Sequence, residues 1–294
     1  MRHLALLLLA GLALPAAEWS LESLYTRPYV WGTPPQSLEW AKRRPVVFFL
    51  WNESGGRFLD LYAYNAATRQ RHRLTALESA TDEFNPPADQ NDARLRSHRM
   101  PEPGLASFSI SADGARAAYA WKGDIYWVSG DGKAGPFRLT QTRAPEGAPR
   151  LSPDGNRIAY TRAGEIFVHD LTTGAVAQLS EAAPNGPAYF FEWSPDGQRI
   201  VFGVQPRPAR IQILPNYSGR FVAARQFQRT VAGDDAAGPV LYTVAARGGK
   251  PVRLGEASGP EWSPDSRSIL AHSVSADRKK DSFLIFDAAT GKPR

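Results

Sequence analysis

A ten-residue phrase recurs along the chain, and its spacing constrains the fold more than any other feature of the sequence. Its clearest copy, residues 151–160, is Leu-Ser-Pro-Asp-Gly-Asn-Arg-Ile-Ala-Tyr. Related copies begin at Ile110, Trp193 and Trp262, and a divergent copy occupies residues 40–49. Successive copies lie about 40 or about 70 residues apart, and about 40 to 50 residues are typical of one four-stranded propeller blade, so the longer steps contain insertions. We therefore predict an all-β fold, a β-propeller of four-stranded blades.

The Pro-Asp-Gly core of the phrase predicts a tight turn that closes a β-hairpin. Proline fixes one φ angle, the short Asp side chain bonds the local backbone, and Gly accepts a positive φ. The recurring aspartates are therefore expected to be turn residues, neither catalytic acids nor calcium ligands. They are Asp113, Asp154, Asp196 and Asp265.

The residues after each turn predict the other strands of a blade. Ile158 and Tyr160 alternate with Arg157, Ala159 and Thr161, a pattern typical of a strand with one buried face. A third strand follows in each repeat, for example at residues 165–169. A three-residue tag comes next and is expected to open the fourth strand. The tags are Arg73-Leu74-Thr75, Arg138-Leu139-Thr140, Gln178-Leu179-Ser180 and Arg253-Leu254-Gly255.

The N-terminus predicts export. Residues 1–17 combine a basic start, an apolar run at residues 4–14 and small residues before Glu18, as in a secretory signal peptide. Residues 18–294 are then one propeller domain in the periplasm or outside the cell. About five blades are visible, and the fifth stops before its tag. We expect an incomplete ring of about seven or eight blades, truncated on the C-terminal side, although an N-terminal strand closing a five-bladed ring is the alternative.

Composition excludes several classes of function. The chain has no Cys, which excludes disulfides, thiolate nucleophiles and Cys-based zinc sites. Its net charge of +6 is dispersed instead of clustered with aromatic residues, so we expect no nucleic-acid partner. No segment after the signal peptide is long enough to span a membrane. We also expect no metal and no cofactor, because the histidines are isolated and phosphate-binding loops are missing.

Three tryptophans precede the turns at equivalent positions of the repeat. Trp40, Trp193 and Trp262 are expected to belong to the blade cores. The alternative is that they line a central channel that binds a ligand.

The Ser-Pro-Asp-Gly repeats resemble those of the TolB family and of the N-terminal propellers of prolyl-oligopeptidase-type serine peptidases. The start at residues 21–25, Leu-Glu-Ser-Leu-Tyr, and the insertion at residues 211–234 are similar to the dipeptidyl peptidase IV branch. That resemblance implies a peptide substrate and an α/β-hydrolase domain after the propeller. The chain itself has no Gly-x-Ser-x-Gly motif, so we expect no catalytic residue in it. The expected function is a non-catalytic, substrate-gating propeller region of an exported serine peptidase whose hydrolase domain is absent from this chain.

The resemblance also implies where a substrate amine would bind. The aminopeptidases of that family hold it with two adjacent Glu residues, located between the blades that begin here at Asp154 and Asp196. This chain has only Glu181 in that segment, so Glu181 is the candidate substrate-binding residue, and dependence on a free substrate N-terminus is not expected. The alternatives are a TolB-like periplasmic protein-binding scaffold and a lectin-like ring. The sequence leaves the oligomeric state open.

Overall fold

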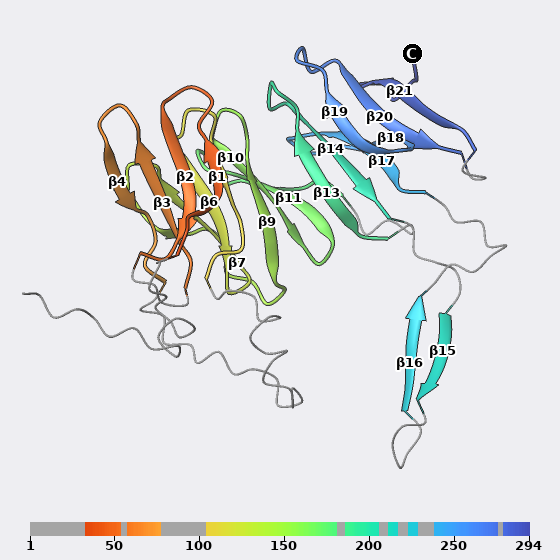
Figure 1. The fold of residues 1–294 in the computed structure, drawn as a ribbon. Coiled ribbons are helices and arrows are strands. Elements are labelled where there is room, and N and C mark those ends of the chain that lie inside the picture. The colour runs from red at the N-terminus through yellow and green to blue at the C-terminus, as the bar shows by residue number, and fades with distance from the viewer. Residues whose placement is uncertain are drawn as a thin grey trace, which may run out of the picture.

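The fold is an arc of antiparallel β-sheets that follow one another along the chain (Figure 1). A computed structural model describes residues 33–53, 58–77, 104–180, 186–205, 211–216, 223–228, 238–275 and 279–294. The predicted all-β propeller architecture is confirmed: each repeat forms one sheet, and the sheets do not close into a ring within these residues. The predicted signal peptide and Glu181 lie outside the described residues. No helix in the described ranges is long and apolar enough to cross a membrane.

The first three sheets are complete blades whose strands pair in chain order. The first contains β1 (Gln36–Trp40), β2 (Val46–Trp51), β3 (Asp60–Asn65) and β4 (Gln70–Arg73). The second contains β5 (Phe108–Ile110), β6 (Arg116–Trp121), β7 (Asp124–Ser129) and β8 (Phe137–Arg138). The third contains β9 (Glu146–Leu151), β10 (Arg157–Arg162), β11 (Glu165–Asp170) and β12 (Val176–Gln178).

The fourth repeat contains an insertion between its second and third strands. Its blade consists of β13 (Ala188–Trp193), β14 (Arg199–Val204), β17 (Val240–Ala245) and β18 (Val252–Glu256). The inserted strands β15 (Ile211–Asn216) and β16 (Ala223–Gln228) pair with each other and project from the blade (Figure 1). The fifth sheet contains β19 (Ser258–Trp262), β20 (Ser268–Val274) and β21 (Asp281–Asp287), and a bridge from Phe286 to Pro293 occupies the position of a fourth strand.

Neighbouring blades pack face to face, so the middle strands are buried on both sides. In β10, Ile158 and Tyr160 pack with Ile125 of the second blade, whereas Ala159 packs with Ile200 of the fourth. All three β10 side chains are at most 1% exposed. The prediction of one buried face at residues 157–161 is therefore wrong, because a blade in the middle of the arc has a neighbour on each side.

The turns after the first strands also connect neighbouring blades. Gly155 has φ 71°, and a Cβ atom there would lie 2.9 Å from the Cβ of Ser111 in the preceding turn. Arg116 donates to the carbonyl of Gly155 at 2.7 Å, and Arg157 donates to that of Gly197 at 2.8 Å. Glycine is therefore required both for its positive φ and for the close approach of successive turns.

Each closing tag is bonded to the start of the third strand of its own blade. In the first blade, Thr75 Oγ1 accepts the amide of Leu61 at 2.9 Å and donates to the buried Asp60 at 2.6 Å, and Arg73 pairs with the same carboxylate at 2.7 Å. The hydroxyls of Thr140 and Ser180 accept the equivalent amides in the next two blades. The expectation that the tag opens the fourth strand is wrong for these blades: β4, β8 and β12 end at its first residue, because the hydroxyl replaces the next ladder bond.

Candidate ligand-binding channel

The first strand of every blade contributes to one shared cavity. Residues of β1, β5, β9, β13 and β19, with the turns that follow them, line a space of about 960 Å³. Ligand sites in proteins commonly measure about 300 to 1,000 Å³, so this space is large enough for a peptide of several residues. We call it the channel.

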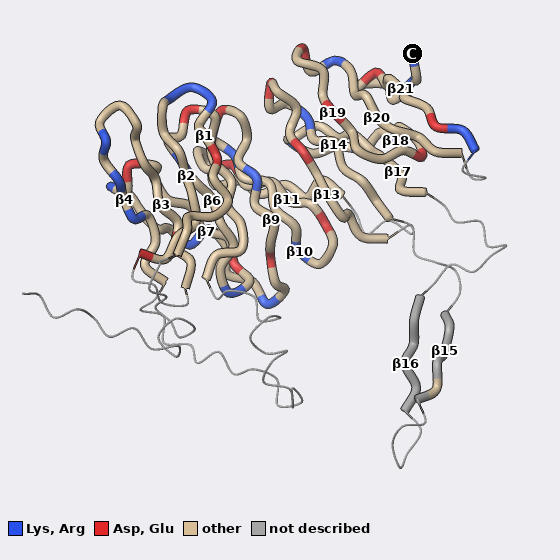
Figure 2. The backbone as a smooth tube through the Cα atoms, in the orientation of Figure 1, with Lys and Arg blue, Asp and Glu red and all other residues tan. Residues whose placement is uncertain are grey.

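One position of the repeat supplies most of the charge in the channel. It lies two residues before the serine of each turn. In the first blade, Ala41 occupies the place of that serine. Its occupants are Glu39, Ser109, Arg150, Glu192 and Glu261. All but Ser109 line the cavity, and Lys42 and Arg43 from the first turn add two further positive charges. Figure 2 shows the resulting acidic positions on β1, β13 and β19.

A β-bulge precedes this position in three of the strands. The pairing register shifts just before Glu39, Arg150 and Glu261. Two residues before each of them the backbone has a positive φ, which is 53° at Ser37, 49° at Ala148 and 55° at Gly259. Bulges redirect side chains and are frequent beside binding sites. The left-handed conformation costs a residue with a Cβ about 1 to 2 kcal/mol. The backbone is therefore strained at Ser37 and Ala148, next to the residues that carry the channel charges.

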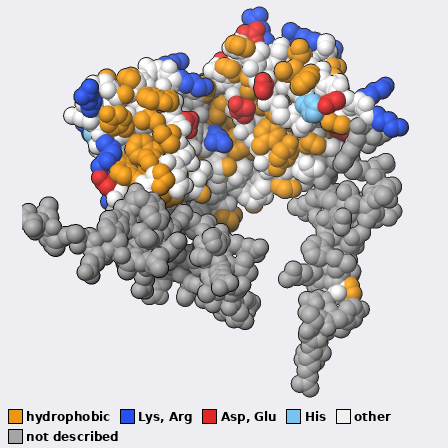
Figure 3. Space-filling model, viewed as in Figure 1, with side chains coloured by type: hydrophobic (Ala, Val, Ile, Leu, Met, Phe, Trp, Pro, Cys, Tyr) orange, Lys and Arg blue, Asp and Glu red, His pale blue; other side chains and the backbone are white. Residues whose placement is uncertain are grey.

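The channel charges surround a common space without forming direct pairs. Among the described residues, the side chains of Glu39, Arg150, Glu192 and Glu261 have no hydrogen bond or ion pair within 4.0 Å. Burial by the channel walls raises the pKa of Glu39 and of Glu192, and the positive charges of Arg150 and Lys42 oppose both shifts. Figure 3 likewise shows acidic and basic side chains close together between the two halves of the arc.

The three turn-preceding tryptophans all line the channel. Trp193 is buried, as predicted, and its Nε1 donates to the carbonyl of Arg150 at 3.0 Å. Trp262 is half-buried, and its Nε1 has no hydrogen-bond partner within the described ranges. Trp40 is 58% exposed, so its assignment to a blade core is wrong: it lies on the innermost strand of the first blade, where no described blade covers it. Trp193 and Trp262 also pack into hydrophobic core clusters, so the blade-core prediction is confirmed for these two, and the alternative of a ligand-binding channel stays a prediction.

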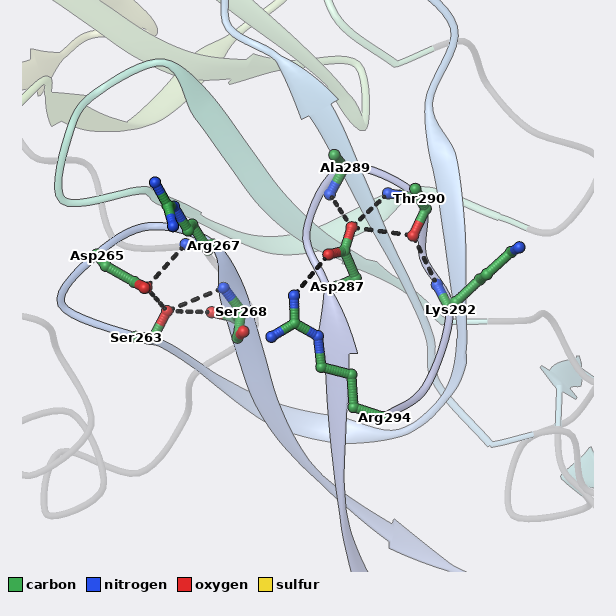
Figure 4. Close-up of polar contacts among 9 residues, drawn as sticks. All are labelled: Ser263, Asp265, Arg267, Ser268, Asp287, Ala289, Thr290, Lys292 and Arg294. Atoms are coloured by element: carbon green, nitrogen blue, oxygen red, sulfur yellow. Dashed lines mark hydrogen bonds and ion pairs between the residues drawn. The ribbon is translucent and has the colours of Figure 1, made fainter.

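The turn aspartates have the structural role that the sequence predicts. Ser194 Oγ donates to Asp196 Oδ1 at 2.6 Å, and this oxygen also accepts the amide of Gln198 at 2.9 Å. Figure 4 shows the same contacts in the fifth blade, where the Ser263 hydroxyl and the Arg267 amide lower the pKa of Asp265. The aspartate carboxylates thus accept hydrogen bonds from groups of their own turn. In the described part of the chain, no three His, Asp or Glu side chains are grouped as metal ligands.

The sequence analysis did not select the carboxylates that the structure brings together. Glu181 cannot be placed, because it lies outside the described residues. Glu39, Glu192 and Glu261 each precede a channel tryptophan, and this recurring Glu-Trp pair was the available signal. The sequence alone does not show which position of the repeat faces the channel, because that depends on how the blades pack together.

Comparison with known proteins supports the fold. No family model matches the chain. Dipeptidyl peptidase 4 of Porphyromonas gingivalis has a TM-score of 0.60 and 12% identity, over 88% of this chain and 39% of that chain. A structure described as a dipeptidyl aminopeptidase IV of Bacteroides ovatus has a TM-score of 0.57 and 14% identity, over 89% of this chain and 36% of its own. TolB of Acinetobacter baumannii aligns with a TM-score of 0.48 and 16% identity, over 88% of this chain and 53% of its own.

The extent of these alignments limits what they establish. The chain spans well under half the length of the two dipeptidyl peptidase structures that it matches. At 12% and 14% identity the likeness concerns the backbone arrangement, and function depends on individual sites instead of on fold. The chain therefore has a β-propeller fold of the kind found in dipeptidyl peptidase structures.

Proposed function

We propose that this chain is the non-catalytic propeller region of an exported serine peptidase of the prolyl-oligopeptidase type, and that its channel gates peptide substrates. The supporting observation is the fold match: 88% of the chain aligns with a dipeptidyl peptidase, while only 39% of that protein is covered. A nucleophilic serine requires a strained strand-to-helix turn, a base and an oxyanion hole. The chain lacks the Gly-x-Ser-x-Gly motif for such a turn, so the chemistry belongs to a separate hydrolase domain.

The dimensions of the channel fit a gating role. A space of about 960 Å³ is large enough for an extended peptide. The blades that line it are held together by shared cores and by the turn contacts from Arg116 and Arg157. A rigid wall of this kind would restrict access to a hydrolase domain by substrate size.

The test uses the polypeptide encoded by the complete reading frame, with the present chain as the matched control. A fluorophosphonate probe is expected to label the complete polypeptide and to leave the present chain unlabelled. The labelled protein should cleave peptides of a few residues and spare folded proteins. Labelling of the chain itself, or a complete reading frame without a Gly-x-Ser-x-Gly motif, would contradict the proposal and favour a binding scaffold.

Export has a separate test. Residues 1–17 fused to alkaline phosphatase, which is active only after export, should give active enzyme, and a fusion starting at residue 18 should not. An inactive first fusion would remove the exported location from the proposal without affecting its peptidase part.

A further inference from the structure

One face of the fifth sheet is apolar and exposed, and no other sheet that the structure describes packs against it. Successive side chains of a strand point to opposite faces of its sheet. The register of β20 and β21 therefore places six side chains on this face, and they are Leu270, His272, Val274, Asp281, Phe283 and Ile285. We call it the end face, because its sheet lies at one end of the arc (Figure 1).

The end face is built like a packing surface between two blades. Phe283 is 73% exposed, whereas Leu241, at the equivalent position of the fourth blade, is 0% exposed. Leu270 and its equivalent Val201 differ in the same way, at 37% and 0%. Side chains of the fifth blade cover Leu241 and Val201. The end face thus repeats a surface that is buried one blade earlier.

One contact between successive blades has no counterpart in the fifth blade. Arg116 and Arg157 follow the turn serine of their blades by five residues, and both donate to the turn of the next blade. The fifth blade has Ser268 at this position, and its side chain is too short to replace the arginine. Another repeat of the same kind would pack on the end face without this contact.

The polar groups of the end face can be covered together. His272 Nε2 and the Asp281 carboxylate contact each other directly, and the His272 ring lies 5.5 Å from the Phe283 ring. Burial of a polar group is unfavourable unless it has a partner. Because these two side chains are partners, covering the face leaves neither of them unpaired.

The size of the end face suits a contact with one further sheet. Its three strands, about 4.8 Å apart and up to seven residues long, span roughly 14 by 23 Å. Two such faces and their rims would bury on the order of 1,000 Å² in total, which is about the lower limit for a specific protein contact.

We propose that the end face binds the end face of a second copy of this chain across a two-fold axis. A two-fold axis sets the same patch of both copies together, so apolar surface meets equally apolar surface. Two sheets can then pack face to face with their strands within about 30° of each other. This inference goes beyond the proposed function and requires no hydrolase domain.

Sedimentation equilibrium of the full chain at about 1 to 200 µM tests the contact. We expect a monomer–dimer equilibrium that is weak, because the buried area is small. Phe283→Asp should raise the dissociation constant at least about tenfold, since it places two carboxylates in an apolar contact. A monomer at about 200 µM would overturn the proposal. A mass that grows beyond the dimer would indicate a head-to-tail contact and would overturn it as well.

Two valines provide a matched pair of variants. Val274 and Val176 are 49% and 51% exposed, but Val176 lies on β12 of the third blade. Val274→Asp should weaken the dimer, and Val176→Asp should leave it unchanged. Urea denaturation shows whether both variants are folded. Equal effects on the dimer would contradict the assignment of the end face.

The geometry can be tested by cross-linking, because the chain has no Cys. Ile285→Cys and Val176→Cys each introduce a single thiol. A bismaleimide should join two copies of the first variant, whose thiol lies in the contact, and should not join two copies of the second. The reverse result would contradict the proposal. Fluorophosphonate labelling of the complete polypeptide is independent of these outcomes, so failure here is distinguishable from failure of the proposed function.

Discussion

The turn and the channel position lie two residues apart in the same repeat, yet they differ in chemistry. At the turn, four blades carry the same pair, in which a serine hydroxyl donates to an aspartate two residues later. At the channel position, the residues that line the cavity are Glu39, Arg150, Glu192 and Glu261, whereas the second blade carries the buried Ser109, which accepts the amide of Leu151. Repetition thus marks the part of the blade that must form the same hydrogen bonds each time, and variation marks the part that faces the cavity.

The energetic consequences of the two positions are also opposite. The turn groups are satisfied by contacts within the blade, so removing one leaves a partner without its bond. The channel carboxylates have no direct partner among the described residues, and burial raises the pKa of two of them. Residues that destabilise the folded state without making a structural contact are typical of functional positions.

The largest effect is expected from removing a turn hydroxyl. Ser194 is fully buried, donates to Asp196 at 2.6 Å and accepts the amide of Arg199 at 2.9 Å. Ser194→Ala should lower the free energy of unfolding by about 2 kcal/mol, because the amide of Arg199 loses its acceptor inside the turn, whereas the exposed Asp196 can bind water instead. Ser263→Ala is the matched control: Ser263 makes equivalent contacts in a more exposed turn, where water can substitute, and its loss should be smaller. Urea denaturation measures both, and equal losses would contradict this explanation.

A smaller, favourable effect is expected from relieving strain beside the channel. Ala148 has φ 49° on the exposed surface of β9, so Ala148→Gly should raise the free energy of unfolding by about 1 kcal/mol. Ser266, with φ 62°, provides the comparison, because its hydroxyl accepts the amide of Asp196 at 3.0 Å. Ser266→Gly should gain less, since this bond is lost. A thermal shift that ranks the two variants in reverse order would argue against strain at the bulge.

The two positions should also respond to pH with opposite sign. The pKa of Glu39 and of Glu192 is raised above 4.5 in the folded protein, so their contribution to stability falls as pH rises from 4.5 through the raised values. The pKa of Asp265 is lowered below 3.8, so its contribution is present above that pH and is lost on acidification through the lowered value.

Variants separate these two contributions. Denaturation experiments measure the free energy of unfolding of a Glu39→Gln/Glu192→Gln variant and of the parent. The difference in favour of the variant should increase between pH 4.5 and pH 7. An Asp265→Asn variant should instead show its deficit above pH 4 and lose it at lower pH. An unchanged difference between the glutamate variant and the parent would show that the channel does not desolvate these carboxylates.

The periodicity of the sequence was sufficient to predict the blades but not to predict which residues line the cavity. The Ser-Pro-Asp-Gly repeat predicts the strands around Asp154 because turn chemistry is local. It could not show that Ala159 is as buried as Ile158, since that depends on blades on both sides. Nor could it show that Glu39 and Glu192, more than 150 residues apart, line one cavity. The tag partner Asp60 was missed for a more local reason: it lies 15 residues before Thr75, and only the pairing of β3 with β4 in the first blade brings the two together.

The most direct test of a functional origin for the channel charges is the stability of a Glu39→Gln/Glu192→Gln/Glu261→Gln variant. Urea denaturation at pH 7 compares it with the parent and with Ser194→Ala. If the carboxylates serve a ligand, the triple variant should be as stable as the parent to within about 0.5 kcal/mol, or more stable, because the carboxylates have no structural bonds to lose and partial burial disfavours the charged form of two of them. A loss of about 2 kcal/mol or more, comparable to that of Ser194→Ala, would show that these carboxylates hold the blades together and would contradict the assignment of the channel as the functional site.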